Sequence, residues 1–250
     1  MPHIILIVLL LVFIICSNLS AVEQKDVSKP PSMPEYNLHL PQIKGKSPCV
    51  IICSGQGYHK DLPLIKEFAL LAEKQGFAAV RFNWSYFTAK GSPSAEGSVE
   101  LKDIESILKM VRQHPAIDTS RIYIAGKSMG SLLAYYAFME HQELKGCLLL
   151  TPLLPDAEQG NAYYPELAKE KRPVAFILGD RDYQMCKLAE LYTYLGTCPQ
   201  HIPVVVLAGD HGIQLENKKN DDAITKLNLE SIRLAAEAAV YRLKVFEMEN

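Results

Sequence analysis

A serine, a pair of aspartates and a histidine stand, in that order along the chain, where three predicted strands end. Ser128 follows the first of these strands, Asp180 and Asp182 follow the second, and His211 follows the third. A serine hydroxyl is a weak nucleophile until a histidine accepts its proton, and a carboxylate must hold that histidine in one orientation. These residue types in this order would support attack on a carbonyl and transfer of an acyl group.

Ser128 lies in a Gly-x-Ser-x-Gly pentapeptide at 126–130, between a β-branched, aromatic run at 122–125 and an apolar run at 131–139. Strand, turn and helix in this order form the context of a nucleophile elbow, whose tight turn lifts the hydroxyl clear of the backbone. The N–H of Met129 would then lie at a helix N-terminus, where it can stabilise an oxyanion. The pentapeptide alone also suits an ordinary turn between a strand and a helix, so the flanking pattern carries the prediction.

The same stretch contains the Gly-Lys-Ser of a phosphate-binding loop. That motif needs a glycine five positions before the glycine of its Gly-Lys pair, and this position holds Arg121. A phosphate-binding loop is therefore excluded. Lys127 is expected to face solvent or the rim of a pocket, with no chemical role.

Two aspartates are candidates for the acid, and a third adjoins the histidine. Asp180 and Asp182 both follow the strand predicted at 174–178, and the residues by themselves leave both open. Asp210 adjoins His211, and adjacent side chains on an extended segment point apart, so Asp210 is not expected to orient the ring.

Apolar residues alternate along the chain between strand-like runs and stretches with helical spacing. This alternation predicts an α/β fold with a doubly wound, mostly parallel sheet, in which functional side chains gather at the carboxyl ends of strands. The expected strands cover 36–40 (an edge strand), 49–53, 77–82, 122–125, 147–150, 174–178 and 204–207. The expected helices cover 62–75, 101–111, 131–139, 183–195 and 227–246.

With these residues in this order, the chain resembles the α/β-hydrolase superfamily over 36–246. It looks closest to the short, lidless branch typified by dienelactone-hydrolase-like and small acyl-hydrolase proteins. The resemblance implies that the acid is Asp182, in a G-x-x-D pattern, and that the base is His211. It also implies that the glycine loop after the first buried strand supplies a second oxyanion N–H, which falls on Gln56. Ser54 stands where many relatives have a histidine.

The connection at 152–172 is too short for a large helical cap. We therefore expect the α/β-hydrolase fold without a large cap domain, and an open site that favours small or surface-presented esters. Five aromatic residues, three after a strand end and two in this connection, could either wall a pocket or pack in the core. They are Trp84, Tyr86, Phe87, Tyr163 and Tyr164.

The chain has 250 residues, of which 22% are charged, and a formal net charge of -2. This length supports one domain with a sizeable core, predicted over 36–250. The near-neutral charge gives no support for nucleic-acid binding or for a polybasic membrane contact.

Residues 4–16 are almost continuously apolar, a run that is short for a bilayer span and typical of the core of a signal peptide. We expect a signal peptide over 1–21, a polar and Pro-rich linker over 22–35, and secretion or delivery to a periplasm. The alternatives are an uncleaved membrane anchor and a lipid on Cys16. After cleavage, no stable membrane insertion is expected.

Six cysteines are present, and none forms a Cys-x-x-Cys pair, so a zinc or redox-dithiol site is not expected. Cys49 and Cys53 would lie about 13 Å apart on one strand, too far to bridge each other. Cys186 and Cys198 could form a disulfide. No metal or organic cofactor is implied, and the expected partner is a small-molecule acyl substrate.

These residues together predict a serine hydrolase that cleaves an ester-type acyl bond through Ser128, His211 and Asp182. The N–H groups of Gln56 and Met129 would bind the oxyanion. Thioester, amide and peptide bonds suit the same residues. The alternative is a catalytically silent member of the fold that acts as a binding or scaffold protein, against which the intact serine, aspartate and histidine argue. Haloalkane or epoxide cleavage on this fold needs an aspartate as the nucleophile, and that position holds serine.

Overall fold

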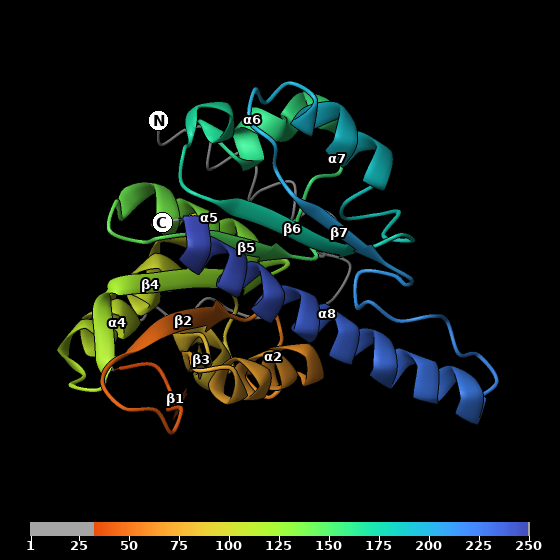
Figure 1. The fold of residues 1–250 in the computed structure, drawn as a ribbon. Coiled ribbons are helices and arrows are strands. Elements are labelled where there is room, and N and C mark those ends of the chain that lie inside the picture. The colour runs from red at the N-terminus through yellow and green to blue at the C-terminus, as the bar shows by residue number, and fades with distance from the viewer. Residues whose placement is uncertain (1–32, 250) are drawn as a thin grey trace.

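The computed structural model describes residues 33–249, and its strands form one sheet (Figure 1). The strands are β1 Tyr36–His39, β2 Ser47–Cys53, β3 Ala78–Phe82, β4 Ile117–Lys127, β5 Cys147–Leu150, β6 Val174–Gly179 and β7 Val204–Leu207. Their order across the sheet is β1-β3-β2-β4-β5-β6-β7. β1 pairs antiparallel with β3, and every other neighbouring pair is parallel. The predicted doubly wound, mostly parallel sheet is confirmed.

Helices cover both faces of this sheet. They are α2 Pro63–Lys74, α3 Ser85–Thr88, α4 Ser98–Gln113, α5 Met129–Glu140, α6 Gly160–Tyr163, α7 Leu188–Leu195 and α8 Asp222–Glu249. α2 and the long α8 lie together across one face, the near face in Figure 1. α4 and α5 pack on the opposite face.

The cover on both faces explains why the central strands are continuously apolar. In β2 every residue is buried. Val50 and Ile52 pack toward α2 and α8, whereas Cys49 and Ile51 pack toward α4 and α5. A strand buried on two faces needs apolar residues at successive positions rather than at alternate ones.

The helix predicted at 183–195 begins only at Leu188. The preceding residues are held in another way, because a carboxylate oxygen of Asp182 accepts the backbone N–H of Met185 at 3.1 Å. The carbonyl of Met185 in turn accepts the N–H of Leu154 at 2.7 Å. Contacts with a distant segment therefore replace the first helical turn that the periodicity predicted.

Two segments that lie between the predicted strands and helices contain short helices. The segment at 83–97 holds α3 and the 3-10 turn η1 (Ala95–Gly97). The segment at 152–172 holds α6 and the 3-10 turns η2 (Ala157–Gln159) and η3 (Leu167–Lys169). These pieces do not build a large cap, as expected.

The disulfide considered between Cys186 and Cys198 is not formed, and both residues are free thiols. They lie on either side of α7, whose eight residues extend over about 12 Å. A disulfide needs the two Cα atoms within about 7 Å, so the helix holds the two thiols apart.

The predicted signal peptide at 1–21 and residues 22–32 of the predicted linker lie outside the described residues. Export, an uncleaved anchor and a lipid on Cys16 therefore stay predictions. Glu35, at the end of the predicted linker, contacts the domain, because its carbonyl accepts the N–H of Asn83 at 2.8 Å. Within 33–249, no helix combines the length and the apolar character that crossing a membrane requires.

Candidate active site

Ser128 occupies a strained turn between β4 and α5. Its backbone has φ 55° and ψ −124°, a conformation that costs a non-glycine residue about 1–3 kcal/mol. A Cβ on Gly126 would overlap the carbonyl of Gly130, and a Cβ on Gly130 would overlap the carbonyl of Ser54. The Ser128 N–H is fixed by the carbonyl of Leu150, at 3.0 Å. Glycine at both flanking positions is therefore a packing requirement of this turn.

The structure brings Ser128, His211 and Asp182 into one hydrogen-bonded chain. The His211 Nε2 atom lies 2.8 Å from Ser128 Oγ, and His211 Nδ1 lies 2.6 Å from Asp182 Oδ2. With its proton on Nδ1, the ring donates to the carboxylate, and Nε2 accepts the hydroxyl proton. The Asp182 side chain is 1% exposed and that of His211 is 22% exposed. The ring can therefore meet a bound molecule while the carboxylate is shielded behind it.

The other two aspartates shape the loop that carries the histidine. The Oδ1 atom of Asp180 accepts the N–H of Gly209 at 2.9 Å. Asp210 Oδ1 accepts the N–H of Gly212 at 2.7 Å. Of the two candidates for the acid, the structure brings Asp182 to the ring. Asp210 does not orient His211, as expected.

The glycine loop after β2 packs directly against the elbow. A Cβ on Gly55 would lie 3.3 Å from the Cβ of Ser128, so only a small residue fits between the loop and the nucleophile. Gln56 follows in this loop, and Met129 is the first residue of α5. The hydrogen bonds among residues 33–249 leave the backbone N–H groups of Gln56 and Met129 without a partner. Both groups are thus free to bind an oxyanion.

Two aromatic side chains form hydrogen bonds with the backbone of the glycine loop after β2. Trp84 is fully buried and donates from Nε1 to the carbonyl of Ser54 at 2.8 Å. The hydroxyl of Tyr86 accepts the N–H of Gly57 at 3.2 Å, and burial raises the pKa of this phenol to about 12. Trp84 therefore packs in the core and does not wall a pocket.

Tyr163 and Tyr164 are also core residues, with 2% and 0% exposure. Tyr164 accepts the N–H of Leu153 through its hydroxyl. Phe87 is half-buried and lies 6.3 Å, between ring centres, from the exposed ring of His59.

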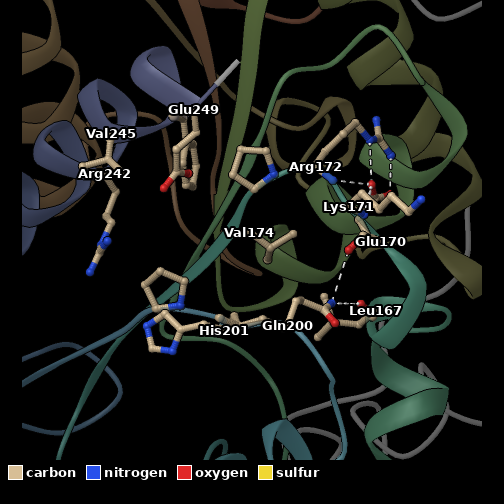
Figure 2. Close-up of a pocket in the computed structure, with 14 residues that line it drawn as sticks. Leu167, Glu170, Lys171, Arg172, Val174, Gln200, His201, Arg242, Val245 and Glu249 are labelled. Atoms are coloured by element: carbon tan, nitrogen blue, oxygen red, sulfur yellow. Dashed lines mark hydrogen bonds and ion pairs between the residues drawn. The ribbon is translucent and has the colours of Figure 1, made fainter.

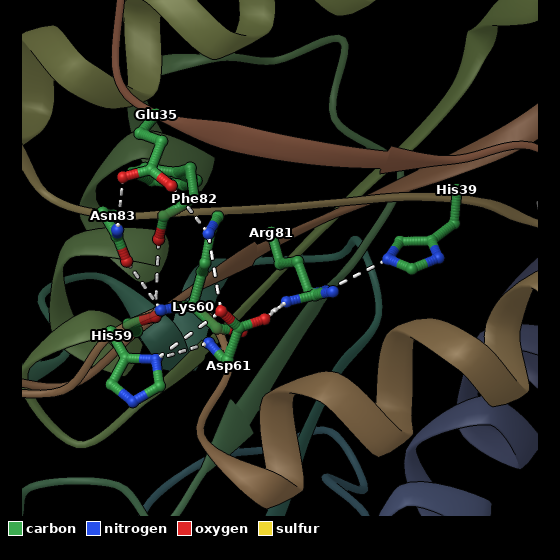
Figure 3. Close-up of polar contacts among 9 residues, drawn as sticks. Glu35, His39, His59, Lys60, Asp61, Arg81, Phe82 and Asn83 are labelled. Atoms are coloured by element: carbon green, nitrogen blue, oxygen red, sulfur yellow. Dashed lines mark hydrogen bonds and ion pairs between the residues drawn. The ribbon is translucent and has the colours of Figure 1, made fainter.

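A polar cluster fixes the chain that leaves the glycine loop (Figure 3). The side chain of Asn83 accepts the N–H of Lys60 at 2.7 Å, and Arg81 donates to the carbonyl of Lys60 at 3.1 Å. Arg81 also pairs with Asp61, and the Lys60 ammonium lies 2.8 Å from Glu35. This cluster was not predicted from the sequence. The one feature of the sequence that could have indicated the cluster is a charged residue, Arg81, inside an otherwise apolar strand.

The burial of the Lys127 side chain differs most from what the sequence predicted. The side chain is 2% exposed rather than facing solvent or a pocket rim. The expectation was wrong because Lys127 is the last residue of β4, inside the sheet, where neighbouring strands and loops enclose it.

A hollow of about 570 Å³ lies at the other end of the sheet (Figure 2). Its walls include Pro173 and Val174 at the start of β6, Pro203 just before β7, and the final turns of α8. Since Asp182 and His211 follow the opposite ends of these two strands, the hollow is separate from the candidate active site. Among the described residues, no group of three or more His, Cys, Asp or Glu side chains could hold a metal ion.

Comparison with known proteins gave one family and many similar folds. The model of a family described as "Alpha/beta hydrolase domain" matches residues 46–240. No curated protein matches this sequence.

Three solved structures illustrate the similarity of fold. An alpha-beta serine hydrolase homologue from Coxiella burnetii is 19% identical, with a TM-score of 0.59 over 79% of this chain and 89% of that one. An a/b serine hydrolase without lid from Xanthomonas campestris is 18% identical, with a TM-score of 0.58 over 83% and 88%. Est1E from Butyrivibrio proteoclasticus, solved with ferulic acid, is 17% identical, with a TM-score of 0.56 over 80% and 92%.

Proposed function

Because the chain belongs to the alpha/beta hydrolase domain family, we propose that it is a serine hydrolase that cleaves an ester-type acyl bond. The observation that carries this proposal is the chain of contacts from Ser128 through His211 to Asp182, at 2.8 and 2.6 Å. Hydrogen-bond distances at both nitrogens of one imidazole are what proton transfer from a serine to a histidine requires.

The proposed reaction has two acyl-transfer steps. Ser128 Oγ attacks the substrate carbonyl carbon while His211 Nε2 takes the hydroxyl proton, and Asp182 stabilises the imidazolium that forms. The tetrahedral oxyanion accepts hydrogen bonds from the N–H groups of Gln56 and Met129. His211 then gives its proton to the departing alcohol, which leaves an acyl group on Ser128. A water molecule, deprotonated by His211, then attacks the acyl carbon. The bond from this carbon to Ser128 Oγ breaks, His211 returns its proton to Oγ, and the acid is released.

The substrate class follows from what surrounds the triad. The 152–172 connection contributes only short helical pieces, and the Ser128 and His211 side chains are only partly buried. An open site of this kind supports small or surface-presented esters rather than long chains that need a closed tunnel. Short aryl esters, including p-nitrophenyl acetate, are therefore suitable first substrates.

Labelling with a fluorophosphonate probe tests the proposal, because the probe reacts with an activated serine. The wild-type domain should be labelled, whereas Ser128→Ala and His211→Ala should lose labelling. His59→Ala is the matched control, since His59 lies in the loop after β2 but is exposed, and the hydroxyl of Ser128 pairs with His211 instead. Folded wild-type protein that resists the probe would contradict the proposal and favour a catalytically silent binding protein.

A further inference from the structure

The outer side of α8 carries a row of exposed apolar side chains. Its members stand seven residues apart, and each is between 42% and 82% exposed. They are Leu227, Leu234, Tyr241 and Met248. Because seven residues are close to two turns of helix, they lie along one line, away from the core residues Ala236 and Leu243. A continuous apolar surface of this kind marks an interaction site.

A second set of residues completes a heptad pattern with this row. Three positions before each member stand Ile224, Ser231, Ala238 and Val245, all partly buried. The two sets occupy the a and d positions of a coiled coil, and Ile or Val at a with Leu at d favours a parallel two-stranded one. The pattern runs over 224–248, more than three heptads, which is the length at which it indicates a coiled coil.

The first turns of α8 project from the domain. The helix starts at Asp222, and its first buried residue is Ile232. Figure 1 shows these turns extending past the sheet at the lower right. Asn228 holds them to the preceding loop by two hydrogen bonds with the backbone of Leu215. A short helix is marginal in water without a packing partner, so a second helix alongside would stabilise these turns.

Charged side chains beside the row match those of a second copy in parallel orientation. In a parallel coiled coil, each g position faces the following e position of the other helix. Glu237 of one copy then meets Arg242 of the other, and Lys244 meets Glu249. Each pair occurs twice in a symmetric dimer. An antiparallel pair in full overlap would bring the two copies of Glu237 together, which disfavours that orientation.

Arg242 lacks an acceptor in its own chain. Its Nε atom is closed to solvent and makes no hydrogen bond within residues 33–249, although a buried donor without an acceptor is costly. Arg233 takes one oxygen of Glu237, at 2.6 Å on the same helix, and the second oxygen of that carboxylate is available. Glu237 of a second copy can therefore supply the acceptor that Arg242 lacks.

We propose that α8 is the interface of a homodimer, in which the a and d side chains of two copies form a parallel two-stranded coiled coil. The occupant of this face is a second copy because the same helix supplies the apolar row and both charges of each flanking pair. The inference is independent of the proposed hydrolase activity, since Ser128, Asp182 and His211 lie outside α8.

Sedimentation velocity of the full-length chain tests the dimer. The wild type should sediment as a dimer, whereas the double variant Leu234→Glu, Tyr241→Glu should be a monomer, because a dimer would bury its carboxylates. Tyr192→Glu is the matched control, since Tyr192 is 52% exposed and lies on α7, and it should remain a dimer. All these chains should keep the wild-type circular-dichroism spectrum and melting temperature, because the replaced side chains are exposed.

Three results would overturn the proposal. The first is a wild type that stays monomeric up to about 100 μM. The second is a dimer that persists in the double variant, because its contacts would then lie elsewhere. The third is a wild-type monomer that co-sediments with vesicles of phosphatidylcholine and phosphatidylglycerol while the double variant does not, which would assign the row to a lipid surface.

Two further measurements test the parallel orientation. The two copies of one d position face each other in a parallel pair, so Leu234→Cys should form a disulfide-linked dimer under mild oxidation, above the baseline of the wild-type thiols. Tyr192→Cys should not. Lys244→Glu and Glu249→Lys should each raise the dimer Kd by about tenfold, and their combination should restore it. A dimer without the cross-link, or without this recovery, would overturn the parallel coiled coil.

Discussion

Asp180 and Asp182 are two residues apart and have different environments. Asp182 is buried and contacts the His211 ring, whereas Asp180 is half-exposed and accepts the N–H of Gly209. An extended segment sends alternate side chains to the same side, so sequence spacing alone does not separate the two. The separation comes from the turn at Asp182, where its second oxygen accepts the N–H of Met185.

Asparagine at each position tests this difference. In Asp182→Asn the ring loses its charged partner and its correct tautomer, so the rate constant for p-nitrophenyl acetate hydrolysis should fall by about 10⁴-fold. In Asp180→Asn the amide oxygen can still accept from Gly209, so the rate should fall by less than about tenfold. Equal losses in the two variants, with melting temperatures unchanged, would show that the assignment of the acid is wrong.

At the scale of elements, the candidate site is a junction between β4, α5 and the glycine loop after β2. The backbone of Gly126 touches that of Gly130, and Gly130 touches the carbonyl of Ser54. Trp84 holds the same Ser54 carbonyl from the other side. The nucleophile and the oxyanion donors are therefore positioned by one packed unit rather than by separate loops.

Gly126→Ala should disrupt this unit. The added methyl group would overlap the Gly130 carbonyl, and neither backbone segment can move without breaking a strand or a helix. We expect a loss of about 3 kcal/mol or more in the free energy of unfolding, measured by urea denaturation, together with loss of labelling. Gly91→Ala is the control, because its nearest neighbour would lie at an ordinary 3.6 Å. Full stability of Gly126→Ala would contradict the packing described for the elbow.

At the scale of the whole molecule, the sheet is apolar on both faces and admits few charges. Lys127 is one of them, and its lowered pKa links the protonation of one side chain to the stability of the entire fold. Below pH 8 the lysine is charged in both the folded and the unfolded chain, and folding carries the full cost of burying that charge. Between pH 8 and 10.5 the unfolded chain holds a proton that the folded chain has released, so this cost falls as pH rises.

Lys127→Met removes that linkage. At pH 7 the variant should be more stable than wild type by about 3 kcal/mol, the equivalent of the shift in pKa. The advantage should shrink as the pH is raised from 8 toward 10.5, because the wild type recovers stability over that range. Urea denaturation of both proteins at pH 7 and pH 10 measures the difference. An advantage that is constant with pH would show that folding does not lower the pKa of Lys127.

Much of this architecture follows from local sequence pattern. The strands at 49–53 and 174–178 are continuously apolar because helices cover both faces of the sheet, and short runs of this kind that end in glycine-containing turns are typical of buried parallel strands. The elbow around Ser128 was equally visible, because the Gly-x-Ser-x-Gly pentapeptide stands between a strand-like run and an apolar helical run. Parallel strands bring their carboxyl ends to one edge, which is why the sequence alone groups Ser128 with His211.

The sequence by itself thus determined the sheet, the position of the elbow and the candidate residues that follow its strands. Tertiary contacts decided the rest. The bond between Leu154 and Met185 shortened α7, and eight helical residues kept Cys186 and Cys198 apart. Strand packing enclosed Lys127, whose burial no local pattern encodes. Periodicity reports which face of an element is apolar, whereas the environment of one polar side chain depends on segments far away in the sequence.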